Sequence, residues 1–382
     1  MNGSIRQRSK GTWQLRYDAP PDGTGKRRFV SETVKGNKKE AERVLRERLA
    51  AIENGGYVAK DKETVAQYMQ RWLQTYAATN TTIRTQEGYK GNVDRYIVPS
   101  IGGIVLQNLT GRHIQIMYGQ MLDRGLSART ALHVHRVLRE ALGHGVKWGI
   151  LTRNVADATT PPRPDNSQAD MWDAETIDQF LVAAEGSRFR NVYHLAVLTG
   201  MRRSELAGLK WDYVDLVNGR LSVIATLQRI IGQGLVAGQP KTPRSRRSIA
   251  LASDAIELLH SLRGRQIEQR LDFGELWMNS GYVFTQEGGK PINPPSVSKD
   301  FASIVRKAEL PHLTFHGLRH AHATLALTAG INPKIVSERL GHSNIAVTMD
   351  TYSHVLPGMQ EAAAQAVEDL LARARINRLD TA

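Results

Sequence analysis

The segment TTPPRPDNSQAD, residues 159–170, most constrains what this chain of 382 residues can fold into. Its three prolines lack a backbone N–H group and fix φ, so neither a helix nor a central strand can continue through it. Polar residues follow the prolines, as is typical of a linker between domains. We place the linker at residues 161–169 and expect domains on both sides, because the chain is long enough for two or three.

The first 58 residues have the pattern of a small sheet followed by a helix. In TWQLRYDAPPDGTGKRRFVSETV, Trp13, Leu15 and Tyr17 alternate onto one face, and PPDGTGK has the composition of a turn between two strands. The next segment, NKKEAERVLRERLAAIENGG, predicts a helix that Asn37 caps and a glycine pair ends. Residues 1–58 are therefore expected to form a compact module.

Positive charge is concentrated before the linker. The net charge of +14 and the pI of about 10.0 favour a polyanionic partner, of which nucleic acid is the commonest. The net charge is +6 over residues 1–58, +6 over residues 59–168 and +2 over residues 169–382. We expect the first two parts to grip a nucleic-acid backbone; a basic surface that only meets solvent is the simpler alternative. The candidate DNA contacts of the first module are Arg16, Lys26, Arg27 and Arg28.

The residues between the first module and the linker have a helical pattern throughout. TVAQYMQRWLQTYAAT and LSARTALHVHRVLREALGHGVKWGIL repeat apolar residues at intervals of three and four, which is the period of an amphipathic helix. We therefore expect an all-helical domain of four or five helices over residues 62–160.

The part after the linker, residues 170–382, mixes helical and strand patterns. WDAETIDQFLVAAEG predicts a helix that Asp173 caps, and NVYHLAVLTG predicts a second helix that ends at Gly200. The Asn-Gly pair in VNGRLSVIAT indicates a hairpin, and QPKTPRSRRSIAL predicts a strand, a basic turn and another strand. Helices dominate the remainder, with YVFT as one short interruption. We expect a mainly helical domain with a small antiparallel sheet.

Several protein classes are disfavoured by what the sequence lacks. The chain has no cysteine, which excludes disulfides, thiolate zinc sites and a cysteine nucleophile. It has no GxxxxGK[ST] motif, and the third glycine of GQGLVAG is misplaced for a dinucleotide-binding loop, so a plain turn is expected there. The N-terminal sequence lacks the apolar core of a signal peptide, and no apolar run approaches the ~18 residues of a membrane helix. We therefore expect a cytoplasmic protein with no membrane partner.

The segment FHGLRHAHAT, residues 315–324, gathers three of the twelve histidines and an arginine without an acidic residue. Metal, nucleic-acid phosphate and plain structure are the three explanations to weigh. His316, Arg319 and His320 share one helix face because their spacing is i, i+3, i+4. Zinc is disfavoured, since a guanidinium lies on that face and no glutamate base is present. Phosphate fits better, because guanidinium binds its oxygens in pairs and histidine can donate a hydrogen bond or move a proton. This segment alone does not decide between phosphate binding and plain structure.

Three other segments carry residues that complete a pattern. TGMRRSEL places an arginine just past the helix-ending glycine, PKTPRSRRS has a lysine on the basic turn, and RLGHSNIAVTMDTYSHV has a Gly-His followed by a tyrosine. Together with HGLR, this order resembles the tyrosine recombinase family, the phage-integrase type of site-specific recombinases. That family has an arginine in a TGxRxxE context, a hairpin lysine, HxxR, Gly-His and a tyrosine nucleophile. The matching positions are Arg202, Lys241, His316, Arg319, His342 and Tyr352.

The resemblance implies an α+β multidomain fold, which type IB topoisomerases share in part. It implies a three-stranded sheet with a helix at residues 1–58 that binds arm-type DNA sites, a helical core-binding domain at 62–160, and a mainly helical catalytic domain at 170–382. It also implies an integrase that cuts and rejoins DNA through a 3′-phosphotyrosyl intermediate, without metal, ATP or other cofactor, to integrate or excise a mobile element. The implied partners are double-stranded DNA with core and arm attachment sites, a homotetramer on synapsed DNA, and an excisionase or a host DNA-bending protein.

The same residue types suit this chemistry on physical grounds. Cutting a phosphodiester without a metal requires protein cations that neutralise the pentacoordinate phosphorane, and two arginines can cover its non-bridging oxygens. A tyrosine has an ordinary pKa of about 10, so it needs a cationic surround or a base, and His316 is expected to accept or relay its proton. Lys241 is expected to protonate the departing 5′ oxygen, and His342 to hydrogen-bond a phosphate oxygen. A phosphotyrosine preserves the bond energy, so rejoining needs no ATP.

Some assignments stay open on sequence alone. Basic neighbours compete with Lys241 for its role, while His320 and His322 are expected to be structural and Glu205 to pair with a basic residue. The DNA-contact candidates on the basic turn are Arg244, Arg246 and Arg247. The tail GMQEAAAQAVEDLLARARINRLD predicts a helix that docks either on its own domain or on a neighbouring protomer.

Two alternative functions remain beside the integrase. A type IB topoisomerase would share the chemistry, but the three-module plan argues against it. A DNA-binding regulator without catalysis would be expected to lack at least one member of the residue set, and the set is complete.

Overall fold

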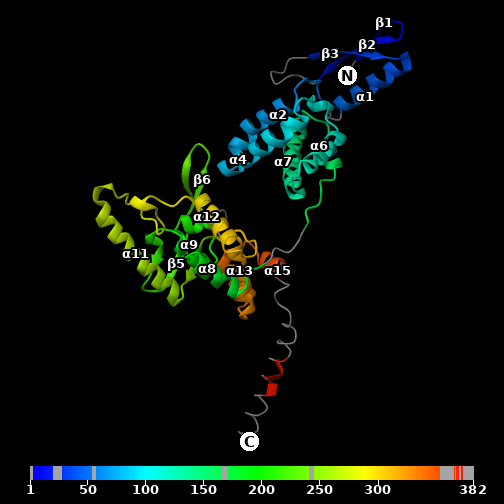
Figure 1. The fold of residues 1–382 in the computed structure, drawn as a ribbon. Coiled ribbons are helices and arrows are strands. Elements are labelled where there is room, and N and C mark those ends of the chain that lie inside the picture. Colours follow the sequence, from blue (N-terminus) through cyan, green and yellow to red (C-terminus); the bar gives the residue numbers. More distant parts are fainter. Residues whose placement is uncertain are drawn as a thin grey trace. The chain divides into compact units, whose positions relative to one another are not determined.

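The computed structural model of this chain describes residues 3–19, 28–53, 57–165, 171–240 and 245–352, together with 365, 367–369 and 371–372. The chain divides into two compact units, residues 1–167 and 168–382, which Figure 1 colours along the sequence. Within the described ranges, no helix combines the length and the apolar character that a membrane crossing requires. The predicted features that lie outside the described residues are the turn with Lys26 and Arg27, the segment with Lys241 and Arg244, and most of the C-terminal helix.

The first unit begins with a three-stranded sheet. Its strands β1 (Gly3–Ser9), β2 (Thr12–Ala19) and β3 (Arg28–Lys35) are antiparallel and adjacent in that order. Leu15 and Tyr17 of β2 are buried against α1 (Lys38–Glu53), as the alternating pattern predicted. Asn37 caps this helix, because its Oδ1 accepts the Glu40 N–H at 2.9 Å.

Helices make up the remainder of the first unit. They are α2 (Val65–Trp72), α3 (Ala78–Asn80), α4 (Ile83–Asn92), α5 (Val98–Ile101), α6 (Gly111–Asp123) and α7 (Ala128–Lys147). π-Helical turns at Leu73–Ala77 and Val93–Ile97 join α2 to α3 and α4 to α5, so the chain runs as four continuous helical stretches. This agrees with the predicted four or five helices. Their apolar faces meet around fully buried Tyr68 and Trp72.

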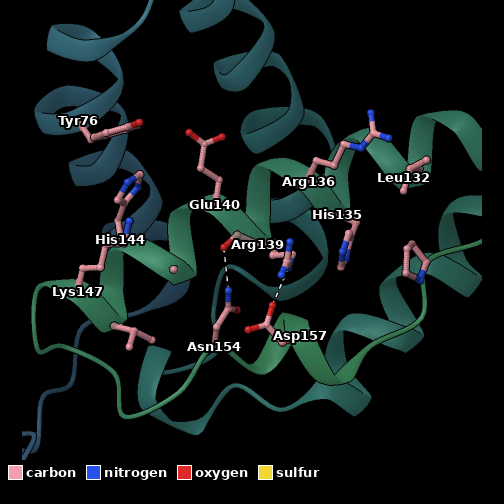
Figure 2. A pocket seen from close by; sticks show the side chains of 13 residues that line it. Tyr76, Leu132, His135, Arg136, Arg139, Glu140, His144, Lys147, Asn154 and Asp157 are labelled. Atoms are coloured by element: carbon pink, nitrogen blue, oxygen red, sulfur yellow. Dashed lines mark hydrogen bonds and ion pairs between the residues drawn. The ribbon is translucent and has the colours of Figure 1, made fainter. Parts of the chain in front are cut away.

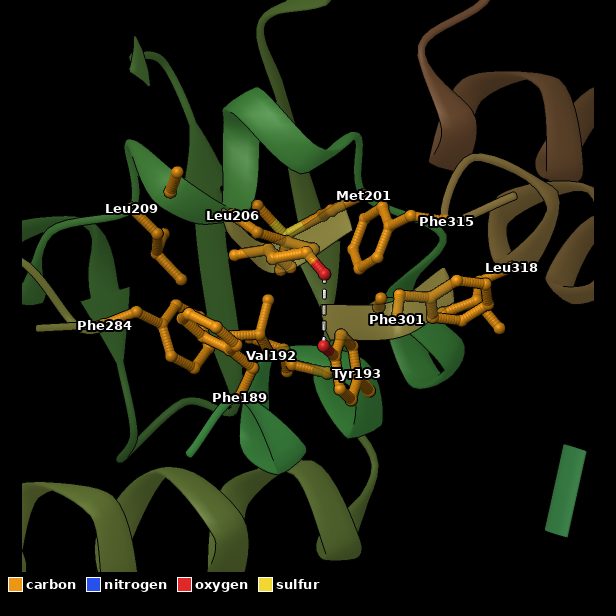
Figure 3. Close-up of a cluster of buried hydrophobic side chains, with 14 of the residues drawn as sticks. Phe189, Val192, Tyr193, Met201, Leu206, Leu209, Phe284, Phe301, Phe315 and Leu318 are labelled. Atoms are coloured by element: carbon orange, nitrogen blue, oxygen red, sulfur yellow. Dashed lines mark hydrogen bonds between the residues drawn. The ribbon is translucent and has the colours of Figure 1, made fainter. Parts of the chain in front are cut away.

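The second unit is mainly helical. Its helices are α8 (Ala174–Ala183), α9 (Arg190–Thr199), α10 (Arg203–Ala207), α11 (Ser253–Phe273), α12 (Pro294–Lys307), α13 (Gly317–Thr328), α14 (Pro333–Leu340) and α15 (Ile345–Tyr352). Asp173 caps α8 as predicted, since its Oδ1 accepts the Thr176 N–H at 2.8 Å. Aromatic side chains fill the core around Phe301, with Tyr193 and Phe315 against it, and Figure 3 shows this cluster. The core thereby fixes α9, α12 and the loop before α13 in one body.

Two small antiparallel sheets accompany these helices. The strands are β4 (Val214–Asp215), β5 (Arg220–Val223), β6 (Thr226–Ile230), β7 (Gly234–Gly238) and β8 (Arg247–Ala250). The hairpin predicted from the Asn-Gly pair is confirmed, because β4 pairs with β5. Of the two strands predicted in QPKTPRSRRSIAL, the second is present as β8, which pairs with β5. The first is absent from its described residues 239–240, because β7 ends at Gly238 and pairs with β6. The YVFT segment forms isolated bridges at Tyr282 and Thr285.

Gly200 ends α9 in the left-handed conformation, with φ of 65°. A Cβ at this position would lie 2.6 Å from Cδ2 of Leu340 and 2.7 Å from Cδ2 of His322. The glycine therefore serves two purposes: it permits the turn that carries the chain to Arg202, and it lets α13 and α14 approach closely.

Replacing Gly200 by alanine is expected to destabilise the second unit by about 1–3 kcal/mol, because the change adds both a strained φ and a steric overlap. Native-state hydrogen exchange of the α9 and α13 amides measures this free energy within the unit concerned. Gly264→Ala in α11 is the matched control, since its Cβ would meet nothing within 4 Å. Equal stability of the two variants would contradict the packing argument.

Candidate active site

Arg202 is positioned by the turn that follows Gly200. It precedes the first residue of α10, and its backbone N–H donates to Glu205 Oε2 at 2.9 Å. Its guanidinium donates to Glu205 Oε1 at 2.8 Å and to the Gly341 carbonyl at 3.4 Å. The side chain is 33% exposed, so one side of this anchored cation still faces solvent.

Arg319, in the first turn of α13, is only 3% exposed. Its two terminal nitrogens donate to the Gly200 carbonyl at 2.9 Å and to the Leu340 carbonyl at 2.6 Å. These carbonyls end α9 and α14, where helix dipoles place partial negative charge. Burial and the nearby charge of Arg202 lower the pKa of Arg319, which still leaves it protonated at neutral pH. Two arginines thus converge from separate elements.

Glu205 is the carboxylate that the site's arginines share, and it is 2% exposed. It pairs with Arg202 on one side and accepts from Arg247 at 2.9 Å and 3.3 Å on the other. Burial raises the pKa of Glu205, but the hydrogen bonds and charges of Arg247 and Arg202 outweigh burial and lower it overall. The expectation of a buried partner for a basic residue agrees with this geometry.

Arg247 differs from what was expected of it. Its side chain is only 6% exposed, and besides Glu205 it donates to the Arg339 carbonyl at 2.5 Å. A guanidinium that is buried and bonded in this way is not placed to contact DNA. The assignment of Arg247 as a DNA contact is therefore corrected: in this structure the residue holds Glu205 in place.

His342 follows the left-handed Gly341 at the end of α14. Its Nδ1 lies 2.7 Å from the hydroxyl of fully buried Thr348, which fixes the ring. Burial, followed by the charges of Arg319 and Arg202, lowers the pKa of His342 to about 4. His342 is therefore a neutral hydrogen-bonding group beside the two arginines.

Tyr352, the last residue of α15, has its ring buried in a small cluster with Leu327, Val336 and Leu340. It is 1% exposed, and its hydroxyl lies 2.7 Å from Nδ1 of His320. Burial raises the pKa of Tyr352 to about 12, although the charge of Arg319 opposes this change. At neutral pH the residue is therefore an un-ionised phenol near the charge of Arg319.

His320 is the functional candidate that sequence reasoning missed, since it was expected only to support its helix face. The i, i+4 spacing placed it beside His316 but did not show which of the two faces Tyr352. The rings of His316 and His320 are nearly perpendicular, with centroids 5.1 Å apart. Burial of the His316 ring, followed by the charges of His320, Arg319 and Arg202, lowers the pKa of His316 to about 4. The residue as a whole is nevertheless exposed to solvent.

His322 has the structural role that was expected. It lies 2.7 Å from the Val197 carbonyl through Nδ1, and its Nε2 accepts from Arg339 at 3.3 Å. Nδ1 therefore carries the hydrogen, and the ring is neutral. Arg339 also donates to the carbonyls of Leu198 and Ala250. This pair joins α9, α13 and α14.

The assembled cluster is strongly electropositive. Arg202 and Arg247 share the carboxylate of Glu205, and Arg319 lies near enough to be affected by the charges of all three residues. Positive charge therefore exceeds negative charge in this cluster. A phosphate would compensate this charge and accept bidentate hydrogen bonds. In the described part of the chain, no group of three or more His, Asp or Glu residues is arranged to hold a metal ion.

The remaining predicted residues are distributed elsewhere. Arg246 is exposed and, with His342, lines a small pocket of about 290 Å³ beside the cluster. Arg16 is exposed on β2, with its guanidinium 4.9 Å from the ring of Phe29. Arg28 begins β3, and Lys26, Arg27, Lys241 and Arg244 lie outside the described residues.

Comparison with known proteins gives matches over both units. The profile described as the phage integrase family matches residues 171–359, and the one described as the phage integrase N-terminal SAM-like domain matches residues 64–122. A tyrosine recombinase XerC-like protein of Caldanaerobacter subterraneus subsp. tengcongensis is 31% identical over 355 residues, which cover 87% of this chain and 90% of that protein. An integrase of Streptomyces ambofaciens is 29% identical and covers 94% of this chain and 92% of its own.

Solved structures confirm the expected fold class. The Tn1549 transposon integrase in complex with a circular intermediate DNA has a TM-score of 0.68 at 21% identity, and the match covers 80% of this chain and 99% of that one. A lambda integrase tetramer bound to a Holliday junction has a TM-score of 0.57 at 21% identity, over 89% and 95% of the two chains. At these identities the likeness concerns the fold.

Replacing Glu205 by glutamine is expected to destabilise the second unit by up to about 3 kcal/mol at neutral pH, because it leaves the buried Arg247 charge uncompensated. The pKa of Glu205 is lower in the folded state than its unfolded value of 4.5, so the carboxylate stabilises the fold above pH 4.5. This stabilisation is lost as the pH falls through the folded-state pKa. The difference in free energy of unfolding between wild type and Glu205→Gln should therefore be largest near pH 7 and smaller below pH 4.5. Urea unfolding at several pH values measures this difference.

Glu338→Gln is the control for this experiment. Glu338 pairs with Lys334 at 3.2 Å, but both side chains are about two-thirds exposed. Its replacement should change stability by less than about 1 kcal/mol. If Glu205→Gln lowered the free energy of unfolding equally at every pH, the stabilising role of the ionised Glu205 carboxylate would be contradicted.

Proposed function

We propose that this chain, which belongs to the phage integrase family of tyrosine recombinases, cuts DNA at the cluster of Arg202, Arg319 and Tyr352. As a member of this family it is a site-specific recombinase, an enzyme that breaks and rejoins DNA strands and integrates mobile elements. The observation that carries the proposed site is the convergence of two arginines on the end of α14, with Tyr352 buried against Leu340 of the same helix and near the charge of Arg319.

Arg202 and Arg319 are proposed to bind the non-bridging oxygens of the scissile phosphate. Both are held in place by helix-end carbonyls, and Arg202 also by Glu205, so little reorganisation is needed when charge develops on the phosphorane. His342, neutral and fixed by Thr348, is proposed to donate a third hydrogen bond to a phosphate oxygen. His316 lies on the exposed side of the same face and is proposed to contact the phosphate there.

Tyr352 is the proposed nucleophile. Its attack would form a 3′-phosphotyrosyl bond and release the 5′ hydroxyl, which later reattacks to rejoin a strand. Lys241 is proposed to protonate the departing oxygen. It follows the β6–β7 hairpin after a short interval of sequence, and its side chain lies outside the described residues.

The first unit is proposed to grip DNA. An open groove of about 870 Å³ runs along α7. Figure 2 shows Arg136, Arg139 and Lys147 among the side chains that line it. All three are exposed; Arg139 is paired with Asp157, while Arg136 and Lys147 project from the helix. Charge of this kind suits a phosphate backbone better than a small ligand.

The division of labour along the chain is also part of this proposal. We assign arm-site binding to residues 1–58, with Arg16, Lys26, Arg27 and Arg28 as contacts, and core-site binding to residues 62–160. Arg246 beside the cluster is a proposed contact to flanking phosphates. The active assembly is proposed to be a homotetramer on synapsed DNA in the cytoplasm, with an excisionase or DNA-bending protein controlling direction.

Tyr352→Phe is expected to abolish a covalent protein–DNA adduct, because the phenyl ring keeps the packing but has no nucleophile. The measurement uses a nicked suicide duplex that carries a core attachment site of the mobile element, followed by denaturing electrophoresis. Tyr213→Phe, which alters a tyrosine outside the cluster, should form adduct like wild type. An adduct that persists in Tyr352→Phe would refute the assignment.

DNA affinity is expected to depend steeply on salt. With ~6–10 phosphate contacts, affinity should fall ~10³–10⁵-fold between 50 and 200 mM salt. Replacing Arg136 and Lys147 by glutamine should reduce the log–log slope by about 1.8, at about 0.9 per contact. Fluorescence anisotropy with a labelled duplex measures the slope.

Arg43→Gln is the control for the salt experiment. Arg43 lies between Glu40 and Glu47 on α1, so its charge is already compensated within the helix. Its replacement should leave the slope unchanged. An unchanged slope in the groove variant as well would show that the groove does not face DNA.

A further inference from the structure

The hydroxyl of Tyr352 has one partner among the contacts of the described residues, and that partner is His320. The 2.7 Å separation from Nδ1 is a short, well-formed hydrogen bond. The two rings lie 5.8 Å apart, and the tyrosine is 1% exposed. The contact joins the last turn of α15 to the first turns of α13.

The direction of this hydrogen bond follows from burial. A buried phenol must donate its hydrogen to an acceptor, because an unsatisfied buried hydroxyl costs about 1–3 kcal/mol. Nδ1 of His320 is the acceptor within reach in the described part of the chain, so the phenol donates and Nε2 carries the ring hydrogen. Burial and the charge of Arg319 lower the pKa of His320, which keeps Nδ1 unprotonated and able to accept.

The position of His320 in the sequence adds a second argument. It directly follows Arg319, so the phenol's partner and a proposed phosphate ligand lie on the same helical turn. The phenol oxygen is thereby held near the charge that lowers its pKa. The other titratable groups that act on this face are His316 of the same helix and His342 after α14. His316 meets the His320 ring edge-on, whereas His320 itself contacts the reacting oxygen.

We propose that His320 is a catalytic residue that takes the phenol proton at Nδ1 as Tyr352 attacks the scissile phosphate. This inference rests on the proposed function and assigns the proton acceptor to His320, where the sequence pattern indicated His316. In the step, the Tyr352 Oη–P bond forms and the P–O5′ bond breaks. The phenol proton moves to His320, and the departing O5′ takes a proton from the leaving-group acid, for which Lys241 is proposed. Rejoining returns both protons.

The test is single-turnover cleavage of the nicked suicide duplex by the full chain carrying His320→Asn. Asparagine can hold the phenol by a hydrogen bond but cannot take its proton. Cleavage should slow by ~100–10,000-fold, the usual contribution of general acid–base catalysis, while DNA affinity stays unchanged. His312→Asn, at an exposed histidine before α13, is the matched control and should cleave like wild type.

The pH dependence distinguishes proton transfer from positioning. The wild-type rate should fall as pH drops through the His320 pKa, which lies below its ordinary value of 6.5, because the protonated ring cannot accept. The wild-type rate should level off above that pKa, whereas the rate of His320→Asn should keep rising by about tenfold per pH unit as phenolate forms. A fluorinated tyrosine at position 352, with a more acidic phenol, should partly rescue the variant.

A duplex with sulfur in place of the bridging O5′ distinguishes the two proton transfers, from the phenol and to the leaving group. A thiolate leaves without help from an acid, so only a defect in proton transfer from the phenol remains visible. The deficit of His320→Asn should persist on this duplex. A deficit that disappears would show that His320 serves the leaving group and would overturn the inference. Should the asparagine variant fail to fold, His320→Gln takes its place.

The outcomes separate the inference from the proposed function. If wild type forms no adduct, or Tyr352→Phe still forms one, the proposed function fails. If wild type forms an adduct through Tyr352 and His320→Asn forms it equally fast, the function stands and the role of His320 is refuted.

Discussion

The site depends on the burial of one positive charge. Arg319 is almost fully enclosed, and a buried cation is tolerated only when hydrogen bonds replace its hydration. Its partners are the carbonyls of Gly200 and Leu340, which lie at the ends of α9 and α14. Because one guanidinium spans both ends, these helices and α13 are held in a single arrangement around it.

Carbonyl partners have a consequence that carboxylate partners would not have. A carboxylate cancels a guanidinium charge, whereas a helix-end dipole stabilises it and leaves most of it in place. Glu205 is the carboxylate in contact with the cluster, and it is shared by Arg202 and Arg247. The chain therefore builds a rigid site with excess positive charge, which is what an enzyme needs to stabilise a phosphorane without reorganising.

The second requirement is a phenol that reacts only in the right place. Burial raises the pKa of Tyr352, so the phenol stays un-ionised and is a weak nucleophile toward other groups. Two neighbours favour loss of the phenol proton: the charge of Arg319 lowers the pKa of Tyr352, and the unprotonated Nδ1 of His320 can accept the proton. Affinity for DNA is proposed to come from a separate part of the chain, since the first unit holds most of the excess charge and a basic groove along α7.

The sequence by itself determined the local features of this protein and the residue types of its site. Caps at Asn37 and Asp173, the end of α9 at Gly200 and the β4–β5 hairpin all follow from backbone preferences of short segments. The ordered set of arginines, histidines and tyrosine indicated the family, because such a set is improbable without a common function.

Only the tertiary structure decided what lies opposite each element. Periodicity shows which side chains share a helix face, but it does not show which other element covers that face. For this reason the sequence did not reveal that His320 meets Tyr352, that Arg247 turns inward to Glu205, or that β8 pairs with β5. Each of these contacts joins segments far apart in the chain, and its free energy comes from burial and charge pairing that exist only once the core has formed.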